Sequence, residues 1–300
     1  MKRMILFLAV NLAAVTLLTG VAAVVCALCG IDLTETLGDG AFAGLFVFSF
    51  IFGMAGSLIS LLLSKTMVKA AMKCRTIDGS EGEAERWLVA TVEDLARRAN
   101  LKTPEVAIYP GEANAFATGA FKNSALVAVS TRIMEQMSKE ELRAVLGHEM
   151  SHVANGDMVT MSLAQGVINT FVIFFSHVLA SVVQAAMENR RDEERRRGRG
   201  NYWLYHMMVQ LFQMVFGLAA AVILMWYSRK REFAADEGSA RLLGTPGPMI
   251  AALRRLNNLQ PGVLPDSIKA FGISGGWSSL FSSHPPLEER IQALMNLPPA

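Results

Sequence analysis

The sequence predicts a mainly α-helical integral membrane protein, with four membrane helices and a smaller polar domain of mixed α and β structure. Hydrophobic residues make up 52% of the 300 residues, and the mean hydropathy of +0.34 exceeds that of ordinary soluble chains. Four stretches contain no Asp, Glu, Lys or Arg: residues 4–31, 40–64, 158–187 and 200–228. Each is long enough to cross the hydrocarbon core as a helix, which takes about 20 residues.

Charge and cysteine content exclude some other classes of protein. The chain has 28 basic and 26 acidic residues, so its formal charge of +2 gives no broad basic surface for nucleic acid. Cys26 and Cys29 lie inside the first apolar stretch and Cys74 stands alone, which does not suggest an extracellular disulfide framework.

The first two apolar stretches predict an N-terminal membrane hairpin over residues 1–64. The first stretch is longer than a signal-peptide core of about 7–15 residues, so we interpret it as a retained helix. Lys and Arg flank the outer ends of the hairpin, whereas the connecting loop, residues 31–40, contains acids and no Lys or Arg. The positive-inside rule therefore places both outer ends, and the polar segment that follows, in the cytoplasm.

Residues 65–157 read as the first part of the polar domain. A helix is expected from about 80 to 99, followed by short strands at 106–109 and 125–129, with an edge segment at 113–118 between them. Ser138, followed three residues later by Glu141, is a capping-box pattern, and it predicts a helix that runs through His152.

Residues 158–228 predict a second membrane-associated hairpin whose topology has two readings. If both of its apolar stretches span the bilayer, six arginines between residues 190 and 199 lie on the outer side, against the positive-inside bias. The alternative is a hairpin that rests in the membrane or against the polar domain. Residues 229–300 then form the second part of the polar domain. We expect one helix at 229–243, a second helix that ends near residue 258, and a last helix that starts around Pro286.

Residues 147–152 contain the motif His-Glu-x-x-His. On a helix, His148 and His152 lie one turn apart on the same face, from which both imidazoles can bind one zinc ion. Glu149 then lies beside the open coordination position, where its carboxylate can accept a proton from a water that attacks an amide carbonyl. We expect one zinc ion per chain with Glu149 as the general base; the alternative is a chance match with two solvated histidines.

A third metal ligand is expected, because catalytic zinc sites typically have three protein ligands. Glu232 is the best candidate, with Asp236 one helical turn later to accept the free ring N–H of a ligating histidine. An antiparallel hairpin over 158–228 would bring His152 and Glu232 together. The alternative for Glu232 and Asp236 is an ordinary exposed, charged helix. The donor set suits zinc best but also permits cobalt or manganese.

These two motifs, with membrane helices before and between them, resemble the HtpX family of membrane zinc proteases, which is related to the CAAX prenyl endopeptidases. The resemblance covers nearly the whole chain. It implies a zincin-type α+β catalytic domain, and it implies that His148, His152 and Glu232 are zinc ligands, Glu149 the base and Asp236 the outer partner. It also implies a multi-pass endopeptidase of the bacterial inner membrane with a cytoplasmic active site. Such an enzyme would cleave damaged or misfolded membrane proteins in quality control and the stress response.

Two further matches to the family concern the substrate. The segment Asn114-Ala115-Phe116-Ala117 resembles the family's edge strand beside the zinc, to which an extended substrate would add by main-chain hydrogen bonds; the alternative is a loop and a core strand. His284 resembles a family histidine that hydrogen-bonds the tetrahedral intermediate. Its alternative is a helix-capping histidine.

Two other functions remain as alternatives. A CAAX-type prenyl peptidase would share the site but needs a closed membrane chamber, for which four apolar segments are too few. A non-catalytic zinc scaffold or chaperone would not require Glu149. Natural substrates and oligomeric state are not predicted by the sequence.

Overall fold

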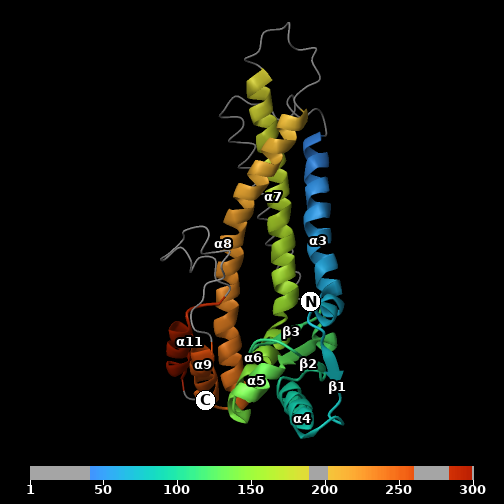
Figure 1. The fold of residues 1–300 in the computed structure, drawn as a ribbon. Coiled ribbons are helices and arrows are strands. Elements are labelled where there is room, and N and C mark those ends of the chain that lie inside the picture. Colours follow the sequence, from blue (N-terminus) through green and yellow to red (C-terminus); the bar gives the residue numbers. More distant parts are fainter. Residues whose placement is uncertain (1–40, 189–201, 260–283, 299–300) are drawn as a thin grey trace. The chain divides into compact units, whose positions relative to one another are not determined.

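The computed structural model describes residues 41–188, 202–259 and 284–298 (Figure 1). The first predicted membrane stretch, residues 4–31, lies outside the described residues, as do residues 260–283. The prediction of four membrane helices therefore stays a prediction for the first of them.

Three described helices are long and apolar enough to cross a membrane: α3 (Ala41–Ala71), α7 (Asp157–Glu188) and α8 (Tyr202–Leu243). They correspond to the second, third and fourth apolar stretches. The separate helix expected from residue 229 is instead the continuation of α8. No Gly or Pro interrupts the chain there, and the Arg and Lys residues that end the apolar stretch favour a helix.

The chain divides into two compact units. The first unit consists of the described residues within Met1–Ser57 and Ala164–Ala220. In this unit α7 packs against α3, where the ring of Phe174 makes edge contacts with Phe42 and Phe46 at centroid distances of 5.2 and 5.8 Å. The α7 helix also contacts α8, because His177 Nδ1 and the Tyr205 hydroxyl share a 2.8 Å hydrogen bond. A histidine inside an apolar stretch usually bonds a neighbouring helix in this way.

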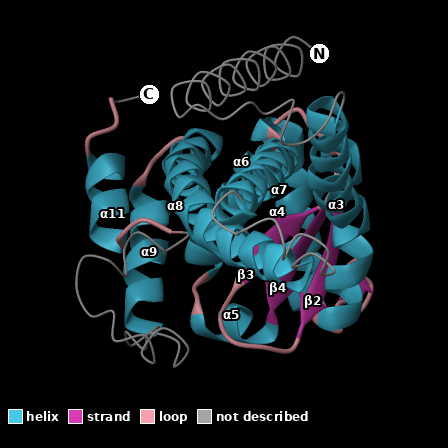
Figure 2. Ribbon diagram, turned by 90° about the horizontal axis from the view of Figure 1, so that it is seen from above, coloured by secondary structure: helices cyan, strands magenta, loops and turns pink. Residues whose placement is uncertain are grey.

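The second unit, Leu58–Leu163 and Ala221–Ala300, contains a four-stranded sheet. Its strands are β1 (Arg75–Ile77), β2 (Glu105–Tyr109), β3 (Ala115–Thr118) and β4 (Leu126–Ser130), in the order β1-β2-β4-β3. The β2 and β4 strands pair in parallel, and the other neighbours are antiparallel. The segment predicted as an edge, 113–118, contains β3, which is the edge strand beside β4 (Figure 2).

The helices of this unit are α4 (Glu83–Arg98), α5 (Thr131–Gln136), α6 (Lys139–Asn155), α9 (Gly247–Leu259) and α11 (Leu287–Met295), with a short 3-10 turn at Lys122–Ser124. Side chains alternate along the strands, so Val106 and Val127 face the main core whereas Ala107 and Ala128 face the other side. Apolar residues of α4, α6, α9 and α11 fill that core. The sequence predicted α4, α6, α9, α11, β2 and β4, and the edge segment that contains β3; it did not predict β1 or α5.

Glu105 at the start of β2 connects the sheet to the end of α3. Its carboxylate lies 2.6 Å from the Lys65 Nζ, contacts the Lys69 amine, and accepts a 2.9 Å hydrogen bond from the Thr76 hydroxyl. Partial burial opposes ionisation of Glu105, but the hydrogen bonds from these three side chains outweigh it and lower its pKa to about 2.

Replacing Glu105 with Gln should therefore destabilise the protein in a pH-dependent way. A depressed carboxyl pKa contributes stability above the unfolded-state pKa of about 4.3, and this contribution is lost as the pH falls toward 2. At pH 7 we expect Glu105→Gln to lower the free energy of unfolding by on the order of 1–2 kcal/mol, allowing for solvent screening. Thermal unfolding in detergent measures this difference in stability between the variant and the unmodified protein. A difference that stays constant from pH 7 to pH 3 would contradict the role of the ionised carboxylate.

Candidate active site

The helix that carries the His-Glu-x-x-His motif, α6, is well delimited. The predicted capping box forms, since the Ser138 hydroxyl accepts a 3.2 Å hydrogen bond from the Glu141 N–H while the Glu141 carboxylate accepts one of 2.8 Å from the Ser138 N–H. At the other end, Gly156 has a φ of +71°, a left-handed conformation that ends the helix directly after the motif. All of the site described below lies within the second compact unit.

The two motif histidines face each other and a carboxylate. His148 Nε2 and His152 Nε2 are 3.1 Å apart, and Glu232 Oε2 and Oε1 lie 3.6 and 3.4 Å from them, respectively. One ligand atom from each of these three residues lies within 4.8 Å of the others. The structure thus brings together the three residues that the sequence predicted as metal ligands.

The hydrogen bonds of the histidines fit a metal site. His148 Nδ1 lies 2.9 Å from Asp236 Oδ1, and His152 Nδ1 lies 2.7 Å from Asp157 Oδ2. A carboxylate opposite Nδ1 fixes the proton on that nitrogen, which leaves the Nε2 lone pairs free for a metal. Two imidazole nitrogens and one carboxylate oxygen are a typical donor set for catalytic zinc, so the residues present fit this ion.

The charges around the cluster also fit a divalent cation. Glu149, Asp157, Glu232 and Asp236 supply four carboxylates, and Arg231 and Arg290 supply two guanidiniums, which leaves two negative charges in excess. Burial opposes protonation of both histidines, but their hydrogen bonds to carboxylates outweigh it and raise both pKa values. His148 bonds Asp236 and Glu232, and His152 bonds Glu232. A metal would replace protons at these nitrogens, which is the usual coupling between metal binding and proton release.

Glu232 reaches the motif because α6 and α8 pack closely. At Gly147 an added Cβ would lie 2.8 Å from the Ser239 hydroxyl, and at Gly238 it would lie 2.5 Å from the Ser151 hydroxyl. Ser239 also donates a buried 2.7 Å hydrogen bond to the Ala144 carbonyl. Small residues on both helices thus allow the backbones to approach, and this sets the distance between the histidines and Glu232.

Glu149 points to the edge strand β3. Its Oε2 accepts a 2.9 Å hydrogen bond from the Ala117 N–H. Burial raises the pKa of Glu149, and the charge of Glu232 acts in the same direction, whereas His148 and His152 oppose the change. Glu149 does not belong to the cluster of three ligand residues, which agrees with a role in proton transfer.

His284 lies next to the third ligand rather than apart from the cluster. Its Nδ1 is 2.8 Å from Glu232 Oε2, while 63% of its side chain is exposed. The predicted contact between His284 and a reaction intermediate stays a prediction; the contact with Glu232 places His284 beside the cluster.

Sequence reasoning missed three residues of the site: Asp157, Arg231 and Arg290. Asp157 follows the helix-ending Gly156 and Arg231 directly precedes Glu232, so their positions in the sequence offered a signal. Arg290 lies on α11, far along the chain from the motif, and nothing in its surroundings marks it. Its guanidinium lies 2.7 Å from both Asp236 oxygens and 3.2 Å from Glu232 Oε2.

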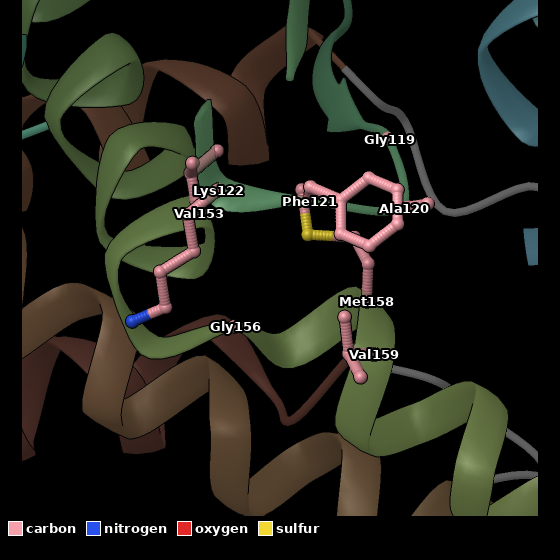
Figure 3. Close-up of a pocket in the computed structure, with 8 residues that line it drawn as sticks. All are labelled: Gly119, Ala120, Phe121, Lys122, Val153, Gly156, Met158 and Val159. Atoms are coloured by element: carbon pink, nitrogen blue, oxygen red, sulfur yellow. The ribbon is translucent and has the colours of Figure 1, made fainter. Parts of the chain in front are cut away.

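A small pocket adjoins the end of α6 (Figure 3). Residues 119–122, which follow β3, line it together with Val153, Gly156, Met158 and Val159. The lining is mostly apolar, and the Lys122 amine hydrogen-bonds the Ala154 carbonyl. None of its lining residues belongs to the cluster of His148, His152 and Glu232.

A helix-borne His-Glu-x-x-His motif with a glutamate beside both histidines, together with long apolar helices, defines the class of the protein as a membrane metallopeptidase. The model of peptidase family M48 matches residues 83–297. The chain belongs to peptidase family M48 and, within it, to the HtpX-type proteases, as the resemblance indicated.

Individual proteins support this assignment. The chain is 50% identical to a "Protease HtpX homolog" from Janthinobacterium sp. (strain Marseille), over 99% of this chain and 100% of that protein. It is also 50% identical to one from Verminephrobacter eiseniae (strain EF01-2), over 99% of each chain. The crystal structure of S. mikatae Ste24p matches with a TM-score of 0.59 and 19% identity, over 97% of this chain and 67% of that one, which shows a shared fold.

Replacing Gly238 with Ala tests how the site is assembled. The new Cβ would overlap the Ser151 side chain, so α6 and α8 must separate, and Glu232 should move away from the histidines. We expect zinc affinity to fall by at least 10-fold. A competition assay with a chelator measures this affinity.

Gly217→Ala in the same helix is the matched control, because among the described residues no atom outside the helix's own nearby backbone lies within 4 Å of its added Cβ. It should bind zinc like the unmodified protein. Equal zinc affinity in the Gly238 and Gly217 variants would show that the close approach does not position Glu232.

Proposed function

We propose that this chain is a zinc-dependent endopeptidase of the bacterial inner membrane, which cleaves damaged or misfolded membrane proteins at the cytoplasmic face. The observation that carries this proposal is the convergence of His148, His152 and Glu232, with the Glu149 carboxylate directed to the edge strand beside them. Zinc in such a site polarises a carbonyl and makes water a stronger nucleophile at neutral pH.

The roles of the side chains follow from their positions. Glu149 accepts the proton of the attacking water and later donates it to the leaving amine. Its raised pKa suits this exchange, since a base that is too acidic binds the proton weakly. We assign to His284 the stabilisation of the oxyanion of the tetrahedral intermediate. Arg290 contacts the same oxygen of Glu232 and holds that carboxylate in place.

The edge strand β3 is the proposed binding site for the substrate backbone. The Ser130 N–H of β4 donates a 2.9 Å hydrogen bond to the Asn114 carbonyl, and the Asn114 N–H donates one of 3.0 Å to the Ser130 hydroxyl. Backbone directions alternate along a strand, so the polar groups of Ala115 and Ala117 point away from β4, and the hydrogen bond from the Ala117 N–H to Glu149 agrees with this. An extended peptide can thus pair with Ala115 without contacts to specific side chains, which suits a protease of unfolded segments. The pocket of Figure 3 follows the end of β3 in the chain, since residues 119–122 line it.

The orientation and the substrate class rest on sequence. The excess of Lys and Arg at the ends of the predicted N-terminal hairpin favours a cytoplasmic active site. A site tethered to the bilayer by apolar helices meets membrane proteins and their unfolded segments first, which favours quality control and the stress response.

Cleavage of casein by detergent-purified, zinc-loaded protein tests the reaction. Removing a general base costs about 10²–10⁴-fold in rate, so Glu149→Gln should lose at least 100-fold in kcat while it keeps one zinc per chain. Glu232→Ala should lose both zinc and activity. Full activity of Glu149→Gln would reject the proposed mechanism in favour of a zinc scaffold, and cleavage restricted to prenylated peptides would favour the CAAX-type alternative.

Replacing Ala115 with Pro tests the binding of substrate along β3. Proline is tolerated at an edge strand where the lost N–H faces away from the sheet, so the variant should fold and hold zinc. The loss of one hydrogen bond should raise KM for an extended peptide by about 2- to 10-fold with little change in kcat.

Phe116→Pro provides the contrasting variant, because its N–H points to β4. It should lower the temperature of unfolding, whereas Ala115→Pro should not. An unchanged KM in a folded Ala115→Pro variant would reject pairing at this position.

A further inference from the structure

Each ligating histidine has its own support, and the two supports are built alike. On His148, Asp236 accepts the Nδ1 hydrogen bond and Arg290 in turn holds Asp236 by two hydrogen bonds of 2.7 Å. The sequence predicted the first half of this arrangement. The second histidine has an equivalent support, which comes from different segments of the chain.

For His152, the carboxylate that accepts the Nδ1 hydrogen bond belongs to Asp157. Its Oδ2 lies 2.7 Å from His152 Nδ1, and its other oxygen forms an ion pair with the Arg231 guanidinium. Only 5% of Asp157 is exposed, so its charge depends on these two partners.

The local backbone explains how Asp157 reaches back to His152. The left-handed conformation of Gly156 ends α6, and Asp157 becomes the first residue of α7. A negative charge at the first turn of a helix is stabilised by the unpaired N–H groups there. The carboxylate is thus held at a helix terminus, beside the last turn of the metal-binding helix.

The link to Arg231 joins this carboxylate to the third ligand. Arg231 directly precedes Glu232 on α8. Asp157 therefore contacts the helix end that carries His152 and, through Arg231, the segment that carries Glu232. One buried carboxylate connects two of the three predicted ligands.

We propose that Asp157 is a positioning residue for His152, and that Arg231 holds its carboxylate in place. Asp157 fixes the tautomer and the ring orientation of His152, as Asp236 does for His148, and it keeps the Nε2 nitrogen directed to the metal. The proposal rests on the zinc site of the proposed function, but it concerns metal affinity rather than peptide cleavage.

The primary test is the zinc affinity of Asp157→Ala and Asp157→Asn, measured by chelator competition on the full-length protein in detergent. Loss of such an outer partner typically costs 10- to 100-fold in metal affinity, and we expect this for Asp157→Ala. Asn keeps an oxygen that can accept the His152 N–H, so Asp157→Asn should bind zinc more tightly than Asp157→Ala. The visible spectrum of the cobalt-loaded protein should change in Asp157→Ala, because it reports the ligand geometry.

Two further variants separate positioning from other effects. Asp94 pairs with Arg97, Arg98 and Arg143 but contacts no ligand, so Asp94→Ala should keep wild-type zinc affinity. Arg231→Gln makes the site more negative, and charge alone would then tighten zinc binding, whereas a loss of positioning weakens it. We expect weaker binding.

The results of the zinc-affinity measurements can be interpreted independently of the casein cleavage assay. Wild-type zinc affinity in Asp157→Ala, or tighter binding in Arg231→Gln, would overturn the positioning role even if casein is cleaved. If the unmodified protein binds zinc and Asp157→Ala loses it, the inference stands even where no protein substrate is cut. Thermal unfolding of the metal-free variants checks that a loss of affinity is not a loss of fold.

Discussion

The close packing of α6 against the C-terminal part of α8 is the constraint on which the site depends. Glycine on one helix meets serine on the other twice, at Gly147 with Ser239 and at Gly238 with Ser151. Helices that carry larger side chains at their contact lie 8–10 Å apart, and Glu232 would then be too far from the histidines. The chemistry of the site thus begins with residues that have no chemical role of their own.

The close packing concentrates negative charge in a small volume, and the surrounding residues compensate for it. Each of the four carboxylates near the histidines has a cationic or N–H partner: Arg290 for Asp236 and Glu232, Arg231 for Asp157 and the Ala117 N–H for Glu149. Buried charges are tolerated in proteins when they are paired and hydrogen-bonded in this way. The same partners hold the carboxylates rigid, and rigidity is what a metal site needs to select one coordination geometry.

Much of this arrangement could be predicted from sequence, for physical reasons that differ between elements. The motif helix was predictable because the capping box and the His-Glu-x-x-His spacing are local patterns. Glu232 was predictable because a hairpin must bring its ends together. Arg290 was not, because its contact with Asp236 depends on how α11 packs, and no local pattern encodes tertiary packing. The continuity of α8 was missed because the change from apolar to charged residues suggested a boundary, although the backbone has no reason to break there. The membrane helix at residues 4–31, and with it the total of four membrane helices, stays a prediction from sequence.

Metal bound by His152 and Glu232 would also act as a cross-link. Coordinate bonds to these two residues close a ring that contains α7 and the first part of α8. The entropy of closing a flexible segment rises only with the logarithm of its length, by about 0.6 kcal/mol for each doubling. In the unfolded chain, where this segment is flexible, the entropy lost on closing the ring therefore depends only weakly on the number of residues that the ring contains.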